Sequence, residues 1–270
     1  MDLGVSGRTC VVTGASKGIG LATSRMLCAE GANVLLVART ERHVVEAADK
    51  CVAAGADAGG GAESFVCDVT EPDAAPRIRA AAEDRFGPPD VLVNNAGTAK
   101  WRDLDDVPDE DWQAAWDLNV MAPMRLMREL VPGMSERGWG RVVNVASTAG
   151  KRPSASMPEY SVAKSAELSL SRLYADRVAS DVVLVNAVCP GPIKSELWMD
   201  EGGLLDQSQK HGGHDSRDEA LDVAGGKRPI GRLGEVDEIA SVIAFLCSEQ
   251  ASYVAGAAWS VDGGTVQVII

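Results

Sequence analysis

Three residues near the middle of the chain have the types and spacing needed to move a proton. Tyr160 and Lys164 are four residues apart in the run Tyr-Ser-Val-Ala-Lys, and Ser147 lies thirteen residues before Tyr160. Residues at i and i+4 share one face of a helix, so the phenol and the ammonium would lie one turn apart. A phenol has an ordinary pKa of about 10, and a fixed cation nearby lowers it toward a range useful for proton transfer. With the Ser147 hydroxyl holding an oxygen against Tyr160, the set predicts protonation or deprotonation of a carbonyl or alcohol oxygen.

The segments that would position this set alternate between apolar, β-rich runs and helical patterns. We expect strands at 9–13, 33–38, 64–67, 90–94, 141–145, 182–187 and 257–261. A helix from about Pro158 to Ala179 would carry both Tyr160 and Lys164. Near-continuous apolar strands are typical of a parallel sheet that is covered on both faces. The chain is therefore predicted to be a single α/β domain over 1–270, a doubly wound Rossmann fold of about seven strands, with ligands at the carboxyl ends of the strands.

A glycine-rich turn follows the first predicted strand and leads directly into a helix. It reads Thr-Gly-Ala-Ser-Lys-Gly-Ile-Gly over 13–20. Glycines at this place let the backbone approach a pyrophosphate, and the helix N-terminus supplies N–H donors. The turn also matches Gly-x-Ser-x-Gly, the nucleophile elbow of a hydrolase, with Ser16 as the nucleophile. That alternative leaves only His43, His211 and His214 as bases, and fluorophosphonate labelling of Ser16 would distinguish it.

Composition excludes several classes of partner. A formal net charge of −13 argues against nucleic acid and anionic membranes. No run approaches the roughly eighteen apolar residues of a membrane helix, and the N-terminus lacks the pattern of a signal peptide. The six cysteines have no metal-ligand spacing and suit reduced, buried thiols, and His211 and His214 are read as loop residues. We therefore expect a cytoplasmic protein that acts on a small molecule and holds no metal.

Six motifs in order resemble those of the short-chain dehydrogenase/reductase family, and the resemblance covers essentially the whole chain. They are the glycine turn, Asn94-Asn95-Ala96-Gly97, Asn119, Ser147, Tyr160-x-x-x-Lys164 and Pro190-Gly191. The similarity is closest to the 3-oxoacyl-carrier-protein reductase-like branch. It implies an oxidoreductase that interconverts a ketone and a secondary alcohol by direct hydride transfer.

The resemblance also implies a role for each catalytic residue. Tyr160 would be the general acid and base, and Ser147 would position the substrate oxygen. Lys164 would bind the nicotinamide ribose and lower the pKa of the tyrosine. Asn119 would hold a water in a proton relay toward Lys164, with a buried helix polar group as the alternative reading.

The implied cofactor contacts come from these motifs and from the segments after the second and third predicted strands. Asn94 is not among them, because it is expected to brace the strand ends. The implied contacts are Gly14, Ser16, Lys17, Gly18, Ile19, Gly20, Arg39, Thr40, Asp68, Val69, Asn95, Ala96, Gly97, Tyr160, Lys164, Pro190, Gly191, Ile193 and Ser195. The second strand ends without a carboxylate before Glu41, and Arg39 and Lys17 offer cations for a 2′-phosphate. NADP(H) is therefore predicted over NAD(H).

The substrate pocket is expected between the segment after Gly97, the segment from Ser147 to Tyr160, and a polar lid at 194–227. An apolar wall suited to a bulky hydrophobic ketone would come from Trp101, Met157, Trp198 and Met199.

Two other functions stay open. One is a 3-oxoacyl-thioester reductase, for which Arg137 is a possible contact to an acidic carrier protein, whereas Asp181 stands where a second basic residue would be expected. The other is a non-catalytic NADP(H) sensor, which the complete set of catalytic residues disfavours. A homotetramer, or else a homodimer, is expected through the long helices and the apolar tail at 266–270.

Overall fold

Seven parallel strands form the central sheet of the computed structural model, which describes residues 2–267. Their order is β3-β2-β1-β4-β5-β6-β9, so the predicted doubly wound sheet is confirmed. The strands are β1 (Thr9–Thr13), β2 (Asn33–Ala38), β3 (Ala62–Val66), β4 (Val91–Asn94), β5 (Gly140–Val145), β6 (Val183–Pro190) and β9 (Ala258–Val261). The order reverses between β1 and β4, and a ligand crevice is expected at their carboxyl ends.

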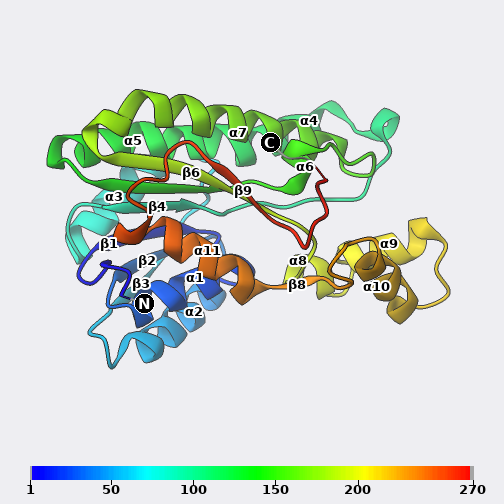
Figure 1. The fold of residues 1–270 in the computed structure, drawn as a ribbon, viewed down its shortest axis with the longest axis horizontal. Helices are drawn as coiled ribbons and strands as arrows, with labels where there is room; N and C mark the ends of the chain where they lie inside the picture. Colours follow the sequence, from blue (N-terminus) through cyan, green and yellow to red (C-terminus); the bar gives the residue numbers. More distant parts are fainter. Residues whose placement is uncertain (1, 268–270) are drawn as a thin grey trace.

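Helices cover both faces of the sheet (Figure 1). One face carries α1 (Gly18–Ala29), α2 (Glu41–Gly55) and α11 (Val236–Leu246), and the other carries α3 (Ala74–Arg85), α5 (Ala122–Arg137) and α7 (Pro158–Val178). Alternate strand residues point to opposite faces. In β2, Val34 and Leu36 join the first core, whereas Leu35 and Val37 join the second. Among the described residues, no helix has both the length and the apolarity to cross a membrane.

The segment 194–227 is more regular than its sequence predicts. It contains α8 (Glu196–Met199), α9 (Leu204–Gly212) and α10 (Arg217–Gly226), and it projects from the body beside a two-stranded ladder of β7 (Ile193–Lys194) and β8 (Gly234–Glu235) (Figure 1). Two buried leucines at the start of α9 and two buried alanines of α10 supply an apolar seam. The Ser216 side chain caps α10 by accepting from the Glu219 amide.

Shorter helices complete the layer around α7. They are α4 (Asp109–Trp116), the π-helical turn η2 (Asp117–Met121), α6 (Thr148–Lys151) and the 3-10 turn η3 (Ala179–Asp181). Two further 3-10 turns are η1 (Leu104–Asp106) and η4 (Glu249–Ala251), and η4 contacts α11.

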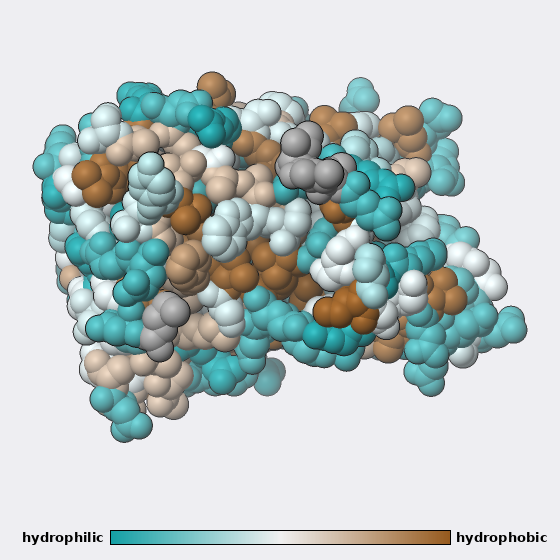
Figure 2. Space-filling view, viewed as in Figure 1, coloured by the Kyte–Doolittle hydropathy of each residue, from teal (hydrophilic) through white to brown (hydrophobic). Residues whose placement is uncertain are grey.

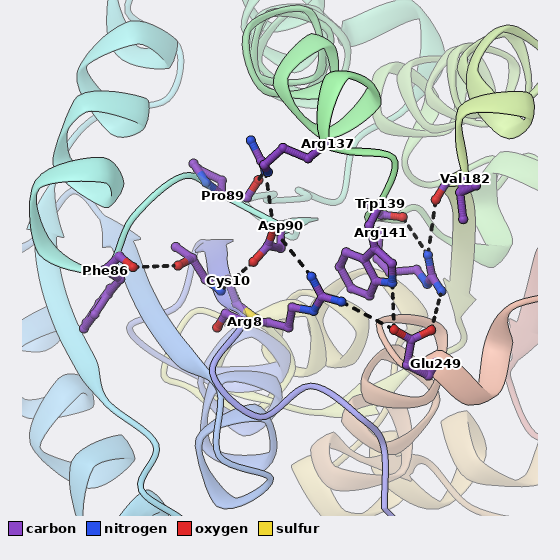
Figure 3. Close-up of polar contacts among 12 residues, drawn as sticks. Arg8, Cys10, Phe86, Pro89, Asp90, Arg137, Trp139, Arg141, Val182 and Glu249 are labelled. Carbon is purple, nitrogen blue, oxygen red and sulfur yellow. Dashed lines mark hydrogen bonds and ion pairs between the residues drawn. The ribbon is translucent and has the colours of Figure 1, made fainter.

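At the amino ends of the strands, the Trp139 ring is held between two guanidinium groups (Figure 3). The Cζ atoms of Arg8 and Arg141 lie 3.8 Å and 4.4 Å from its centroid. Arg141 is 1% exposed, and its Nε donates to the Ser248 carbonyl. Burial lowers the pKa of Arg141, and the Glu249 carboxylate, which also accepts from the Trp139 indole, opposes that shift. This network joins strand starts, so it stabilises the edge of the sheet opposite to the expected crevice.

Candidate active site

A cavity of about 830 Å³ runs along the carboxyl ends of the strands. It is lined by all of the predicted cofactor residues except Gly20, and by Ser147, Tyr160 and Lys164. The sheet therefore brings together residues that are up to about 180 positions apart in the chain, from the glycine turn to Ser195.

The glycine turn is shaped by backbone conformations that a side chain would disturb. Gly14 and Gly18 have φ of +63° and +57°, in the left-handed region. A Cβ on Gly14 would come within 2.8 Å of the Ala96 Cα, and one on Gly20 within 2.5 Å of the Gly14 carbonyl oxygen. Gly20 thus packs beneath the turn and does not line the cavity, which differs from its predicted role as a direct cofactor contact.

The turn leaves donors open to the cavity. Lys17 precedes α1 without a capping side chain, so the amides of the first helical turn have no side-chain acceptor. The Asn95 Nδ2 donates to the carbonyls of Thr13 and Gly14 at 2.9 Å and 3.1 Å and fixes the turn. Uncapped amides at a helix N-terminus fit a pyrophosphate. Asn94 lies behind it and donates to the Asn144 side chain at 2.8 Å, so it braces β4 against β5 as expected.

The far end of the cavity carries a cation and a carboxylate. The Arg39 Nη1 lies 3.6 Å from the Asp68 Oδ2, and the Arg39 side chain is 73% exposed. Burial alone would raise the pKa of Asp68, but hydrogen bonds from Thr70 and the Arg39 guanidinium lower it below its ordinary value. The Thr40 hydroxyl makes no cap bond to α2 and lines the cavity. This end can therefore hold a sugar hydroxyl or a phosphate between Asp68 and Arg39.

Helix α7 supplies the phenol and the ammonium. Tyr160 lines the cavity, and the Lys164 Nζ lies 5.7 Å from the centroid of the Tyr160 ring. Lys164 is 2% exposed, and its Nζ donates to the Val145 carbonyl at 2.8 Å, at the end of β5. The ammonium is thus anchored between α7 and the sheet, within electrostatic reach of the phenol.

Ser147 follows β5 and caps α6. Its Oγ accepts from the Ala149 amide at 3.1 Å, which fixes the hydroxyl while leaving it at the cavity wall. Tyr160 and Ser147 therefore border one cavity, as the sequence predicts.

Asn119 is buried in the π-helical turn and does not line the cavity. Its Nδ2 donates to the Ala115 carbonyl at 2.9 Å, whereas its Oδ1 has no hydrogen-bond partner among the described residues. A Cβ placed on Gly97 would lie 3.4 Å from this oxygen and 3.8 Å from the Lys164 Nζ. The two polar atoms thus face the same small space, which suits a bridging water.

Glu167 is the residue of this site that sequence reasoning missed. It is 1% exposed, and its Oε2 accepts from the Lys164 Nζ at 2.8 Å. Burial raises the pKa of Glu167, and the Lys164 ammonium opposes this. Burial would lower the pKa of Lys164, but the Glu167 carboxylate and the Tyr160 phenol raise it above its ordinary value. The sequence did contain a signal for this pair, because Glu167 follows Lys164 by three residues and so lies on the same face of the predicted helix.

Helix α9 contacts the segment after Gly97 at one wall of the cavity. The Trp101 amide donates to the Gln207 Oε1 of α9 at 2.7 Å, and its ring stacks on His211 at 6.0 Å between centroids. Trp101, Met157 and Trp198 line the cavity as predicted. Met199 instead faces a second cavity of about 290 Å³, because successive residues of a helix point about 100° apart.

The cavity lining contains polar side chains as well as the expected apolar ones. In addition to Trp101, Met157 and Trp198, several further serines and cations line the cavity, namely Arg152, Ser154, Ser156, Ser208, Lys227 and Arg228. The Arg228 Nε is buried and has no partner among the residues that the structure describes. Burial also lowers the pKa of Arg228.

Comparison with known proteins agrees with this geometry. A family model described as enoyl-(acyl carrier protein) reductase matches residues 14–266. The chain is 36% identical over 263 residues to the monensin polyketide synthase putative ketoacyl reductase of Streptomyces virginiae, covering 95% of this chain and 96% of the relative. The chain belongs to the short-chain dehydrogenase/reductase family. This family membership makes it an oxidoreductase, as predicted.

Two further relatives show the range of this family. The 3-oxoacyl-acyl-carrier-protein reductase FabG of Vibrio cholerae is 31% identical over 266 residues, with 98% of this chain and 100% of the relative covered. The structure of L-sorbose reductase from Gluconobacter frateurii, complexed with NADPH and L-sorbose, matches with a TM-score of 0.91 and 36% identity over 100% of both chains.

Proposed function

We propose that this short-chain dehydrogenase/reductase interconverts a ketone and a secondary alcohol with NADP(H), and that Tyr160 is its general acid and base. The observation that carries the proposal is the shared cavity of Ser147, Tyr160 and Lys164, which continues into the glycine turn. A hydroxyl, a phenol and an ammonium so arranged bind and protonate one oxygen.

Each side chain has a distinct task in the proposed reaction. When bound in this cavity, NADPH would supply the hydride for the carbonyl carbon. Ser147 holds the carbonyl oxygen in the near-attack position, and Tyr160 donates a proton to that oxygen as it gains negative charge. Lys164 stabilises the resulting phenolate, and a water held by Asn119 returns a proton toward it.

Charge at the adenosine end supports NADP(H). Arg39 and Lys17 line the cavity, and β2 ends without a carboxylate that would accept from a ribose 2′-hydroxyl. The similar L-sorbose reductase was solved with NADPH, and a similar protein described as a putative NAD(P)-dependent gluconate 5-dehydrogenase was solved with NADP.

A 3-oxoacyl-thioester reductase is the alternative, supported by the ketoacyl reductase relatives. Arg137 is already engaged within the chain, since its Nη2 bonds the Pro89 carbonyl and lies 3.4 Å from Asp90. Asp181 is a carboxylate near the position where a carrier-protein reductase would be expected to have its second basic residue. These charges favour a free small-molecule substrate over one carried by an acidic protein.

A substrate panel and one variant test the proposal. We expect NADPH oxidation with at least one of a set of ketones, keto sugars, β-keto esters and acyl thioesters. Tyr160→Phe should lower kcat/KM by about 10²–10⁴-fold with NADPH binding retained, because it removes only the transferable proton. No turnover of any substrate class, with tight NADPH binding, would favour the sensor; a fully active Tyr160→Phe would contradict the role of the phenol.

We also propose that 194–227 is the substrate lid. A further proposal is that the chain forms a homotetramer or homodimer. Val162 and Leu173 on α7 are 50% and 67% exposed. Apolar side chains gather in the middle of the face drawn in Figure 2, over α11 and β9. Phe245 of α11 and Trp259 of β9 stack with their ring centroids 5.7 Å apart. The last three residues of the predicted apolar tail lie outside the described part of the chain. Light scattering during size-exclusion chromatography tests the assembly.

A further inference from the structure

Packing alone does not explain why Lys164 and Glu167 form a buried ion pair. Both side chains are at most 3% exposed, and the Glu167 Oε2 lies 2.8 Å from the Lys164 Nζ. An ionised carboxylate is costly in a dry interior unless it is paired, and an apolar residue of similar volume would avoid that cost. Of the other buried positions of α7 nearby, Ser161 and Ala163 are small and uncharged, and Glu159, which is 6% exposed, is a second carboxylate. A carboxylate buried at this position therefore indicates a role in the neighbouring site of Tyr160 and Lys164.

We propose that Glu167 compensates the charge of Lys164 and so keeps Tyr160 a proton donor to higher pH than a lone lysine would allow. This positioning role rests on the proposed function. An uncompensated ammonium within about 4–6 Å lowers the pKa of an acid by about 1–3 units. The Lys164 Nζ lies 5.7 Å from the Tyr160 ring centroid, and Glu167 sits directly on that nitrogen. Tyr160 therefore faces a nearly neutral pair, which suits carbonyl reduction, where the phenol must start protonated.

The other titratable neighbours do not replace this compensation. On β6, burial raises the pKa of the Cys189 thiol to about 11, so this thiol is neutral at working pH. On α6, the Lys151 ammonium is directed to β9, where it donates to the Ala258 carbonyl at 2.6 Å and the Ser260 hydroxyl at 3.0 Å. On β5 and the π-helical turn, the groups facing Lys164 are the uncharged Val145 carbonyl and Asn119 amide. On α7 itself, the buried Glu159 precedes Tyr160, and its Oε2 has no hydrogen-bond partner among the described residues. The ion pair of Lys164 is with Glu167, and Lys164 is the charged group that opposes the raised pKa of Glu167.

Replacing Glu167 by glutamine removes the charge and keeps the shape and an acceptor for Lys164. In Glu167→Gln the pH profile of kcat/KM for alcohol oxidation, which rises as the phenol ionises, should move toward acid by about one unit. The falling limb for ketone reduction should move by the same amount. Glu167→Asp, which retains the carboxylate, should recover most of the wild-type profile.

A spectroscopic titration gives a readout without turnover. The chain has three tyrosines, so the phenolate absorbance of Tyr160 is obtained as the difference between each protein and its Tyr160→Phe version. The titration of Tyr160 should move toward acid in Glu167→Gln apoprotein. Asp176→Asn is the matched control: it removes an exposed carboxylate of the same helix, about 24 Å along the axis from Tyr160, and should leave both profiles unchanged.

The outcomes separate this inference from the proposed function. An unmoved or alkaline-shifted Tyr160 titration in a Glu167→Gln protein that keeps its thermal melting transition would overturn the role of Glu167. An equal shift in Asp176→Asn would overturn it as well. If wild type reduces no ketone at all, the proposed function fails, and the absorbance titration still decides whether Glu167 controls the phenol.

Discussion

Arg39 is the residue through which the predicted choice of NADPH over NADH can be tested most directly. Its guanidinium stands at the end of β2, 3.6 Å from Asp68 and 73% exposed, so it is free to turn toward a phosphate. A hydrogen bond to a charged group contributes about 1.5–3 kcal/mol, and about 1.4 kcal/mol corresponds to a factor of ten. Arg39→Asp should therefore lower the ratio of kcat/KM for NADPH to that for NADH by about 10- to 100-fold.

The same substitution also gives NADH a new partner. A carboxylate at this position accepts from the ribose 2′-hydroxyl of NADH and repels a 2′-phosphate. Folding should change little, because a pair as exposed as Arg39 and Asp68 contributes at most about 1 kcal/mol. The assay is initial-rate kinetics with both cofactors against one ketone, with thermal melting as the check on folding.

A matched control variant at Arg42 separates the effect of net charge on the cofactor ratio from the effect of position. Arg42 lies one turn further along, is 82% exposed, pairs with Glu46 at 2.9 Å and does not line the cavity. Arg42→Asp makes the same charge change nearby and should leave the cofactor ratio within about twofold of wild type. The reasoning is refuted if Arg39→Asp leaves the ratio unchanged, or if Arg42→Asp changes it equally.

Three further changes test other parts of the structure. Asn119→Ala should lower kcat about 10- to 100-fold with the NADPH dissociation constant unchanged, as measured by nucleotide fluorescence, because in the proposed mechanism the side chain holds the relay water and no cofactor atom; weakened binding with normal kcat would contradict this. Arg141→Met should lower the free energy of unfolding by about 2–3 kcal/mol in urea without a loss of kcat, since its buried hydrogen bonds lie at the opposite sheet edge; a stable but inactive variant would argue against it. Glu238 is held at a pKa of about 2, chiefly by Arg232 and then by the Glu235 amide, so its stabilisation is present above its unfolded pKa of about 4.3 and is lost as pH falls toward 2. Glu238→Gln should therefore melt below wild type at neutral pH, with the difference closing by about pH 2.

The strands and the order of the motifs could be predicted because they depend on local patterns. The runs at 9–13 and 33–38 coincide with β1 and β2, since nearly every residue in them is buried between two helical layers. Helices α9 and α10 were not predicted, because each buries only a few residues, such as Leu205 in α9 and Ala220 in α10. So few apolar positions do not predict a helix from the sequence alone, because each of these helices depends on packing against its neighbours.

Within the site, sequence could assign residue types but not every direction in which they point. Tyr160 and Lys164 were predictable from helical spacing alone, whereas Gly20 and Met199 lie near the cavity without lining it. Their positions depend on the contact of Gly20 with Asn95 and on the rotation of α8, and neither is local to the motif.

The sequence by itself determined the doubly wound sheet, the anion-binding turn and the residues able to transfer a proton, because these follow from hydrophobic spacing and side-chain chemistry. Only the tertiary structure decided that Glu167 is buried against Lys164 and that the Asn119 oxygen faces the same space as the ammonium. It also decided that cations such as Arg228 line the cavity. The physical reason is that the charge felt by Tyr160 depends on burial and on atoms from several elements, and those distances exist only after the chain has folded.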